Sequence, residues 1–166
     1  MLQIKTYVGP SSIHGLGLFA AEDIQKDSIV WQYTTFSVQK FNSSDFLKLC
    51  GRLPHASLIT LLDHFYKYKG EFYYLNDNTR FINHSGEASN LKLLDNNVEI
   101  ASRKISTGEE LLENYHQLYD PDDFFFLNLD YKTMTNAAIL SRLGELYQAA
   151  ESEHSRPGIH MRAGRS

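Results

Sequence analysis

Three short motifs contain the residues of this chain whose types and spacing suit ligand binding and chemistry. They are HGLGLFA at 14–20, RFINHSGEASNL at 80–91 and GEELLENY at 108–115. Glycine has no Cβ, so a Gly-x-Gly loop lets the backbone approach a ligand closely. Asn and His side chains bond polar groups, and a tyrosine offers an apolar ring together with a hydroxyl. Each motif alone is compatible with an ordinary turn, loop or strand, so their order in one short chain is the informative feature.

Taken together, the motifs resemble the active site of SET-domain protein methyltransferases over residues 5–120. The resemblance implies transfer of a methyl group from S-adenosyl-L-methionine to a protein lysine side chain. It implies that the glycine loop, the Asn-His pair, the closing tyrosine and a later phenylalanine bind the cofactor: His14, Gly15, Leu16, Gly17, Asn83, His84, Tyr115 and Phe124. For Phe124, the first of three consecutive phenylalanines, stacking on adenine and core packing explain the residue equally well.

The methyl acceptor is expected to enter a narrow channel of tyrosines. Methyl transfer to an amine needs a neutral nucleophile held in line, so positioning is the main catalytic task. A lysine ammonium entering an apolar channel near a sulfonium loses hydration and meets like charge, and both effects favour the free amine. By the resemblance Tyr115 is the first catalytic residue, and Tyr119 and Tyr66 complete the channel, with Tyr73 and Tyr74 as alternatives to Tyr66. Without the motif, Tyr115 would be a half-buried strand residue and Tyr119 a loop aromatic.

Glu113 departs from the family pattern, because many relatives place Phe or Tyr two residues before the closing tyrosine. A carboxylate there either holds the incoming ammonium by a charge-assisted hydrogen bond or faces solvent, and the sequence leaves both open. The usual NHSCxPN is here NHSGEASN, with Gly86 and Ser89 in place of cysteine and proline. We expect altered loop geometry and retained binding from these two changes.

Two alternatives to lysine methylation stay open. One is a catalytically weak SET-like binding module, and the other is methylation of a non-lysine acceptor. A metal site is not expected, because HExxH is absent and no second histidine stands at ligand spacing from His84. Cys50 is the only cysteine, which excludes a multi-cysteine zinc site, so the chain resembles small, cysteine-poor SET proteins without zinc-binding pre-SET or post-SET segments.

Charge and composition limit the kinds of partner that we expect. The net charge is −4 and no basic stripe is present, so no direct nucleic-acid binding is expected. No apolar run is long enough to cross a bilayer and no secretory signal is visible, so we expect no membrane and a cytoplasmic location, with nuclear entry or export as an effector left open. The expected partner is a protein or peptide with an accessible lysine, for example a basic, histone-like one. Oligomeric state is open.

The elements that must position the motifs are short. At 166 residues the chain has room for one domain with a sizeable core. β-branched and aromatic residues predict strands at 4–8, 28–36, 71–75, 91–94 and 98–102, and helices are predicted after Ser43 or Ser44, after Pro54 and after Thr135. We therefore predict a β-rich α+β fold. By the resemblance this is the SET-domain fold, with short sheets, a threaded C-terminal segment and a C-terminal helix. The predicted division is a catalytic domain over 1–130 with a variable insert at about 40–70, a helical segment over 131–150 and a flexible tail over 151–166.

Overall fold

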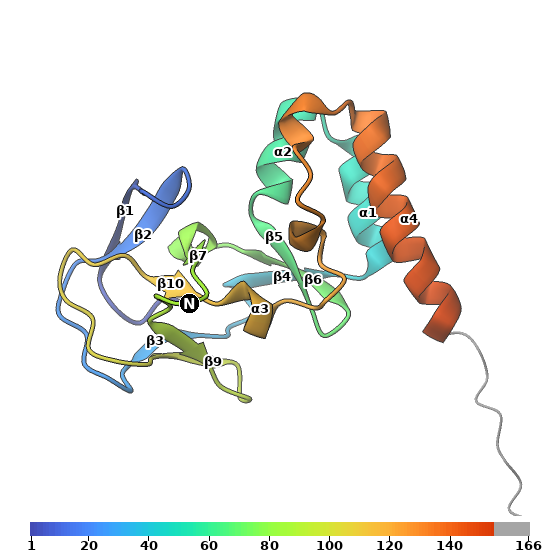
Figure 1. The fold of residues 1–166 in the computed structure, drawn as a ribbon. Coiled ribbons are helices and arrows are strands. Elements are labelled where there is room, and N and C mark those ends of the chain that lie inside the picture. The colour runs from blue at the N-terminus through green and yellow to red at the C-terminus, as the bar shows by residue number, and fades with distance from the viewer. Residues whose placement is uncertain (155–166) are drawn as a thin grey trace, which may run out of the picture.

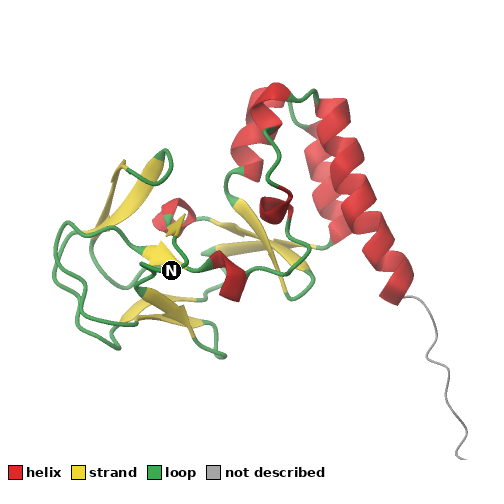
Figure 2. Cartoon of the chain, viewed as in Figure 1, coloured by secondary structure: helices red, strands yellow, loops and turns green. Residues whose placement is uncertain are grey.

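The computed structural model describes residues 1–154, which form a β-rich part and a helical part (Figure 1). The strands are β1 (Thr6–Pro10), β2 (Leu16–Ala20), β3 (Ile29–Gln32), β4 (Val38–Phe41), β5 (Phe65–Tyr68), β6 (Glu71–Leu75), β7 (Asn83–His84), β8 (Leu91–Leu93), β9 (Val98–Ala101) and β10 (Leu112–Glu113). The helices are α1 (Ser43–Arg52), α2 (His55–Leu62), α3 (Tyr115–Leu118) and α4 (Asn136–His154), with 3-10 helices η1 (Asn78–Phe81), η2 (Phe124–Leu127) and η3 (Tyr131–Thr133). The long helices gather at one end of the molecule and the short strands fill the rest (Figure 2).

Four small sheets form the β framework, and none of them closes into a barrel within residues 1–154. β1 pairs with β2, and β3, β9 and β8 form a three-stranded antiparallel sheet. A second antiparallel sheet has the order β4, β6, β5, while the short strand β10 runs parallel to β7. These sheets and the C-terminal helix confirm the predicted β-rich α+β fold. Threading of the C-terminal segment stays a prediction.

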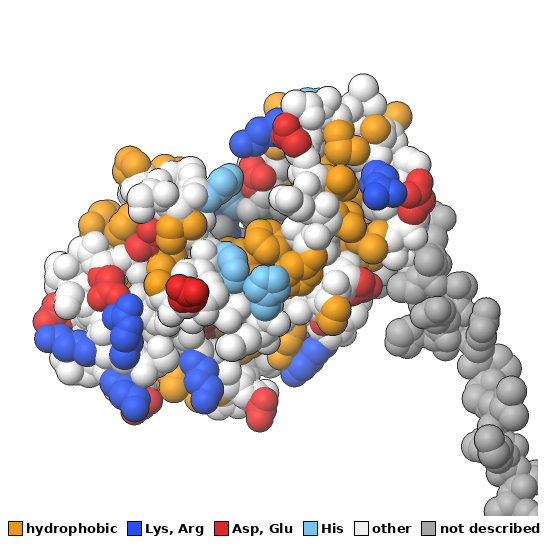
Figure 3. All heavy atoms as spheres, in the orientation of Figure 1, with side chains coloured by type: hydrophobic (Ala, Val, Ile, Leu, Met, Phe, Trp, Pro, Cys, Tyr) orange, Lys and Arg blue, Asp and Glu red, His pale blue; other side chains and the backbone are white. Residues whose placement is uncertain are grey.

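The parallel pairing of β7 with β10 brings the second and third motifs together. Asn83 lies opposite Leu112, and His84 lies opposite Glu113. Leu111 also donates its backbone N–H to the carbonyl of Leu18 in β2, at 2.7 Å. The strand that carries GEELLENY therefore contacts both other motifs, and all three meet on one face, where the space-filling view is hollowed between the β-rich and the helical part (Figure 3).

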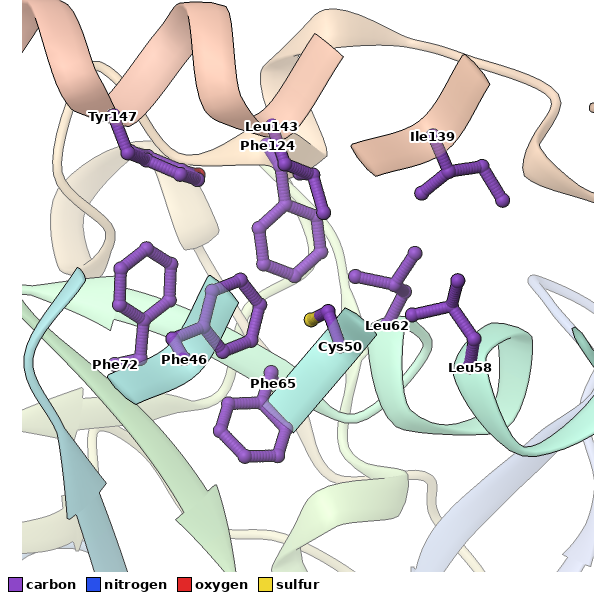
Figure 4. Packing of buried hydrophobic residues seen from close by; sticks show 10 residues of the cluster. All are labelled: Phe46, Cys50, Leu58, Leu62, Phe65, Phe72, Phe124, Ile139, Leu143 and Tyr147. Carbon is purple, nitrogen blue, oxygen red and sulfur yellow. The ribbon is translucent and has the colours of Figure 1, made fainter. Parts of the chain in front are cut away.

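Two apolar cores lie on either side of the hollow, one in the helical part and one in the β-rich part. In the helical part, aromatic rings dominate: Phe46 of α1 stacks on Phe72 of β6 at 4.0 Å, and Tyr147 of α4 meets Phe72 edge-on at 4.7 Å (Figure 4). In the β-rich part the core is aliphatic and includes the fully buried Leu18 and Ile105. Burying each large apolar side chain is worth about 1.5–3 kcal/mol, so both walls are rigid supports.

The helix starts follow from local capping. Asn42, and not Ser43 or Ser44, caps α1, because its side chain accepts the backbone N–H of Asp45 at 2.8 Å. The predicted cap was therefore one or two residues too late along the chain. Thr135 does precede α4, and its hydroxyl accepts the N–H of Ala138 at 3.3 Å.

α4 buries the predicted face and is longer than expected. Ile139, Leu143 and Tyr147 are fully buried against α1 and β6. The helix runs to His154, past the expected boundary at 150, and the rest of the expected tail, 155–166, lies outside the described residues. None of the described helices is long and apolar enough to cross a membrane.

Candidate active site

A cavity of about 710 Å³ lies where the three motifs meet, between the two parts of the fold. Histidine and apolar side chains surround it on the face shown in Figure 3. Its lining residues include two groups, which take their names from the roles expected from the sequence. The cofactor side comprises His14, Gly15, Leu16, Asn83 and His84, and the acceptor side comprises Tyr66, Tyr73, Glu99, Glu113, Tyr115 and Tyr119. Both groups border the same space.

Asn83 fixes the glycine loop on the cofactor side. Its side-chain amide donates to the carbonyl oxygens of His14 and Leu16 at 3.2 and 3.0 Å, and to Oε1 of Glu110 at 2.8 Å. The side chain is nearly buried, so these contacts hold it in one orientation. Gly15 has φ +48°, a backbone conformation that favours glycine. Asn83 thus shapes the loop that borders the cavity.

Glu110 was missed by the sequence analysis, although it stands inside GEELLENY. Its carboxylate accepts hydrogen bonds from Asn83 and, at 3.0 Å, from the hydroxyl of Ser11. A Cβ at Gly17 would collide with this carboxylate. Gly17 is not among the residues that line the cavity, and its lack of a side chain leaves room for Glu110, so its contact with the cofactor stays a prediction.

His84 and Tyr115 are joined by the strand pairing. The backbone N–H of Tyr115 donates to Nδ1 of His84 at 3.1 Å, and their rings lie 5.1 Å apart. Burial lowers the pKa of His84, and the neighbouring His116 adds to this effect. A neutral ring that accepts at Nδ1 carries its proton on Nε2, so His84 is a positioned hydrogen-bonding group.

Four tyrosines form a continuous stack along the acceptor side. Ring centroids are separated by 5.4 Å for Tyr73 and Tyr66, 4.9 Å for Tyr66 and Tyr119, and 4.3 Å for Tyr119 and Tyr115, with interplanar angles of 16°, 11° and 20°. The hydroxyl of Tyr115 donates to the carbonyl of Ile82. Burial raises the pKa of Tyr66, Tyr115 and Tyr119, so all three hydroxyls are neutral.

Tyr74 is not part of this stack. Neighbouring residues of a strand point to opposite faces, and Tyr73 takes the cavity face of β6. Tyr74 packs instead on Phe65, at 5.1 Å, against the helical core. Tyr74 thus faces the helical core whereas Tyr73 lines the cavity, and a channel role for Tyr74 stays a prediction.

Glu113 lines the cavity together with a second carboxyl group, Glu99 of β9, which the sequence analysis did not single out. Glu99 is only 4% exposed. Burial raises the pKa of Glu113 to about 7, against a lowering contribution from its hydrogen bond with Glu99. Burial also raises the pKa of Glu99 well above its usual range, and the charge of Glu113 raises it further. Each carboxyl group is therefore harder to ionise than an exposed glutamate, and Glu99 more so than Glu113.

Neighbouring residues of the phenylalanine run at 124–126 have different surroundings. Phe124 borders the cavity but is 2% exposed and stacks on Phe46 at 6.0 Å, which favours core packing for this residue. Phe125 is 43% exposed and meets Tyr115 edge-on at 5.1 Å and His84 at 5.9 Å. Asp123, which caps η2 through the N–H of Phe125 at 2.7 Å, sets this arrangement. Phe125 is therefore the ring placed beside both sides of the cavity.

Solved structures with a related fold include two from Chaetomium thermophilum Polycomb Repressive Complex 2. The autoinhibited complex bound to S-adenosylmethionine matches at 19% identity and TM-score 0.53, over 87% of this chain and 17% of that chain. A humanized mutant bound to the inhibitor GSK126 matches at 23% identity and TM-score 0.51, over 70% and 15% of the two chains. This chain therefore spans only a small part of those relatives, and the likeness supports the fold.

A further match is a Plasmodium falciparum protein described as a candidate histone methyltransferase, at 26% identity and TM-score 0.46, over 69% of this chain and 95% of that chain. A search of curated proteins found no match. The model of the SET-domain family matches residues 15–116, which span all three motifs from Gly15 to Tyr115. The chain therefore belongs to the SET-domain family.

Proposed function

We propose that the protein is a methyltransferase that transfers a methyl group from S-adenosyl-L-methionine to the side-chain amine of a lysine in a protein or peptide. The observation that carries this proposal is the single cavity bordered by both the Asn-His and glycine-loop residues and the tyrosine stack. The rings of His84 and Tyr115, 5.1 Å apart, connect the two sides. A cofactor and an acceptor side chain would therefore meet within one space.

The cavity residues fit a ligand with several polar groups. Two buried ring nitrogens, Nε1 of Trp31 and Nδ1 of His64, have no hydrogen-bond partner among the described residues, and both side chains line the cavity. Buried polar groups are normally paired, so these nitrogens are available to a ligand. The volume also lies within the range of small-molecule sites. The loop of His14 to Leu16, Asn83 and His84 would hold the cofactor, which supplies a methyl group carried on a sulfonium.

On the acceptor side the protein supplies desolvation and position. The stacked rings of Tyr66, Tyr119 and Tyr115 form an apolar wall of the cavity, and such a wall disfavours a hydrated ammonium. The carboxyl groups of Glu99 and Glu113 attract a cationic side chain to this wall. This chemistry supports lysine as the acceptor, and a basic, histone-like peptide as the substrate class.

Binding is tested without knowledge of the substrate. S-adenosylhomocysteine at roughly a hundred times its dissociation constant should stabilise the protein by about 2.7 kcal/mol, which raises the unfolding midpoint by several degrees. Asn83→Ala should abolish this shift because it removes the contacts that hold the glycine loop. Asn96→Ala, at an exposed turn position, is the matched control and should keep the shift.

Transfer is tested with radiolabelled S-adenosyl-L-methionine and a peptide library centred on lysine, beside the same library centred on arginine. Label in the lysine library alone supports the proposal, and Tyr115→Phe should reduce it. Label on another side chain would show a non-lysine acceptor. A binding shift without any label, in the library or in a protein lysate, would favour a SET-like binding module instead.

A further inference from the structure

We propose that Glu113, with Glu99 beside it, is the proton acceptor that converts the incoming lysine ammonium into the free amine. This inference rests on the proposed function and assigns it a catalytic base. Glu113 would touch the substrate nitrogen, so it would be a catalytic residue. Glu99 would act through Glu113 and is a positioning residue.

The fold brings the two carboxyl groups together from separate strands. Glu113 lies in β10, which pairs with β7, while Glu99 lies in β9, opposite Trp31 of β3. Both glutamates line the cavity, and the charge of Glu113 raises the pKa of Glu99, as expected for two carboxyl groups that lie close together. Glu99 is 4% exposed, so its carboxyl group is held inside the protein, where it borders the cavity.

An unpaired polar group in the same wall points to a ligand. Trp31, the strand neighbour of Glu99, is 7% exposed, and its Nε1 has no hydrogen-bond partner among residues 1–154. A buried N–H left unpaired costs about 1–3 kcal/mol unless something occupies the adjacent space. Because this N–H is a donor, the wall that contains Glu99 and Glu113 offers a partner to an acceptor atom, which the lone pair of a neutral amine can supply and an ammonium cannot.

The groups around the pair leave its negative charge uncompensated. Tyr66 of β5 and Tyr115 and Tyr119 around α3 face it, and burial, followed by interactions that include the charge of Glu113, raises the pKa of all three. The cations that line the cavity are Lys40, Arg80 and Lys132, and none of them contributes to the pKa shift of either glutamate.

Lys40 is engaged elsewhere, and the remaining neighbours are aromatic or acidic. Its ammonium lies 3.5 Å from Glu71 and 4.9 Å from the ring centre of Tyr73. His84 of β7 lies opposite Glu113 in the strand register and is neutral, and Asp123 of η2 adds negative charge near Tyr115 and Tyr119. An entering lysine would be the cation that this wall lacks.

The proton step balances within these groups. The pair begins with one proton and one negative charge. One N–H bond of the lysine ammonium breaks and its electron pair stays on nitrogen, while an O–H bond forms on the Glu113 carboxylate. The amine is then neutral and both carboxyl groups are protonated. After the methylated product leaves, Glu113 returns its proton to water.

The first test follows the carboxyl groups directly and needs no cofactor. Glutamate labelled with ¹³C at the carboxyl carbon is titrated by NMR in the wild type, Glu113→Gln, Glu99→Gln and the exposed control Glu87→Gln, with n-butylammonium chloride as a lysine mimic and n-butanol as its neutral counterpart. We expect n-butylammonium alone to lower the titration midpoint of Glu113, and Glu99→Gln to move that midpoint by itself. An unchanged Glu113 midpoint with n-butylammonium would overturn the inference.

The second test measures the pH profile of transfer to the lysine-centred library. General-base catalysis is typically worth about 10²–10⁴-fold, so Glu113→Gln should lower the rate by that order at neutral pH. The variant should keep its thermal shift with S-adenosylhomocysteine, and its rate should keep rising with pH where that of the wild type levels off. If the wild type methylates lysine and Glu113→Gln reproduces its pH profile, only the inference fails. If the wild type methylates no lysine, the proposed function fails with it.

Discussion

The two sides of the cavity are held in different ways. On the cofactor side, one amide, that of Asn83, donates to two backbone carbonyls and to Glu110, so the geometry is fixed by hydrogen bonds within the motifs. On the acceptor side, side chains from β5, β6, β9, β10 and the α3 region are positioned by ring stacking and by burial of the Glu99 and Glu113 carboxyl groups against the cavity. The first arrangement is intolerant of change, whereas the second can be altered to change chemistry without rebuilding the backbone.

The largest effect we expect is a loss of stability with rising pH, and it arises from Glu113 on the acceptor side. Unfolded glutamate has a pKa of about 4.3, whereas that of Glu113 is about 7 in the fold, so the native state binds more protons in this window. The contribution of Glu113 to the free energy of unfolding is therefore fully present below about pH 4 and is lost as the pH rises through 7. At about 1.36 kcal/mol per pKa unit, the loss from Glu113 is roughly 4 kcal/mol.

Glu113→Gln should remove that part of the decline, as measured by urea unfolding at about pH 5 and about pH 8. The exposed control Glu87→Gln should decline like the wild type. Glu99, whose pKa burial raises well above its usual range, and Asp123, whose pKa burial raises to about 7, should both preserve some decline in Glu113→Gln. Equal slopes in Glu113→Gln and the wild type would show that burial does not raise the pKa of Glu113.

We expect a somewhat smaller effect from a substitution that disrupts the hydrogen bonds of the cofactor side. In Gly17→Ala the new methyl group would displace the Glu110 carboxylate, which removes one of the three acceptors of Asn83 and the carboxylate acceptor of Ser11. We expect a loss of about 1–3 kcal/mol in the free energy of unfolding and loss of the thermal shift with S-adenosylhomocysteine.

Gly51→Ala is the matched control for this substitution. Gly51 lies in α1 with no atom within 4 Å of an added Cβ, so alanine there should stabilise by about 0.5–1 kcal/mol. The two substitutions add the same atom, and only their surroundings differ. If both variants retained the ligand shift, Glu110 would have no part in shaping the glycine loop.

The contrast also explains what the sequence could predict. The cofactor side depends on residues within motifs, so His14, Gly15, Leu16, Asn83 and His84 were all identified, and each borders the cavity. Glu110 escaped because its role depends on the close packing of two distant segments, β2 and the strand before Tyr115.

The acceptor side depends on register and rotation, which a single sequence does not fix. Tyr73 and Tyr74 are equal candidates until the pairing of β6 with β4 and β5 decides which face each takes. Phe124 and Phe125 differ only in how η2 turns. The Glu99–Glu113 pair joins two strands that are not neighbours in any sheet, so no spacing rule could have associated them.

The smallest effect we expect comes from Phe125, which contacts both sides of the cavity. Its substitution tests to which side the ring belongs. Its ring meets His84 on the cofactor side and Tyr115 on the acceptor side, both edge-on. Such aromatic contacts are worth about 0.5–1.5 kcal/mol each, so Phe125→Ala should weaken S-adenosylhomocysteine binding by roughly tenfold in calorimetry. The highly exposed Phe36 provides the control, and Phe36→Ala should leave binding unchanged. If Phe125→Ala instead preserved S-adenosylhomocysteine affinity and lowered only the rate of lysine methylation, the ring would belong to the acceptor side, and the cofactor side would consist of hydrogen bonds alone.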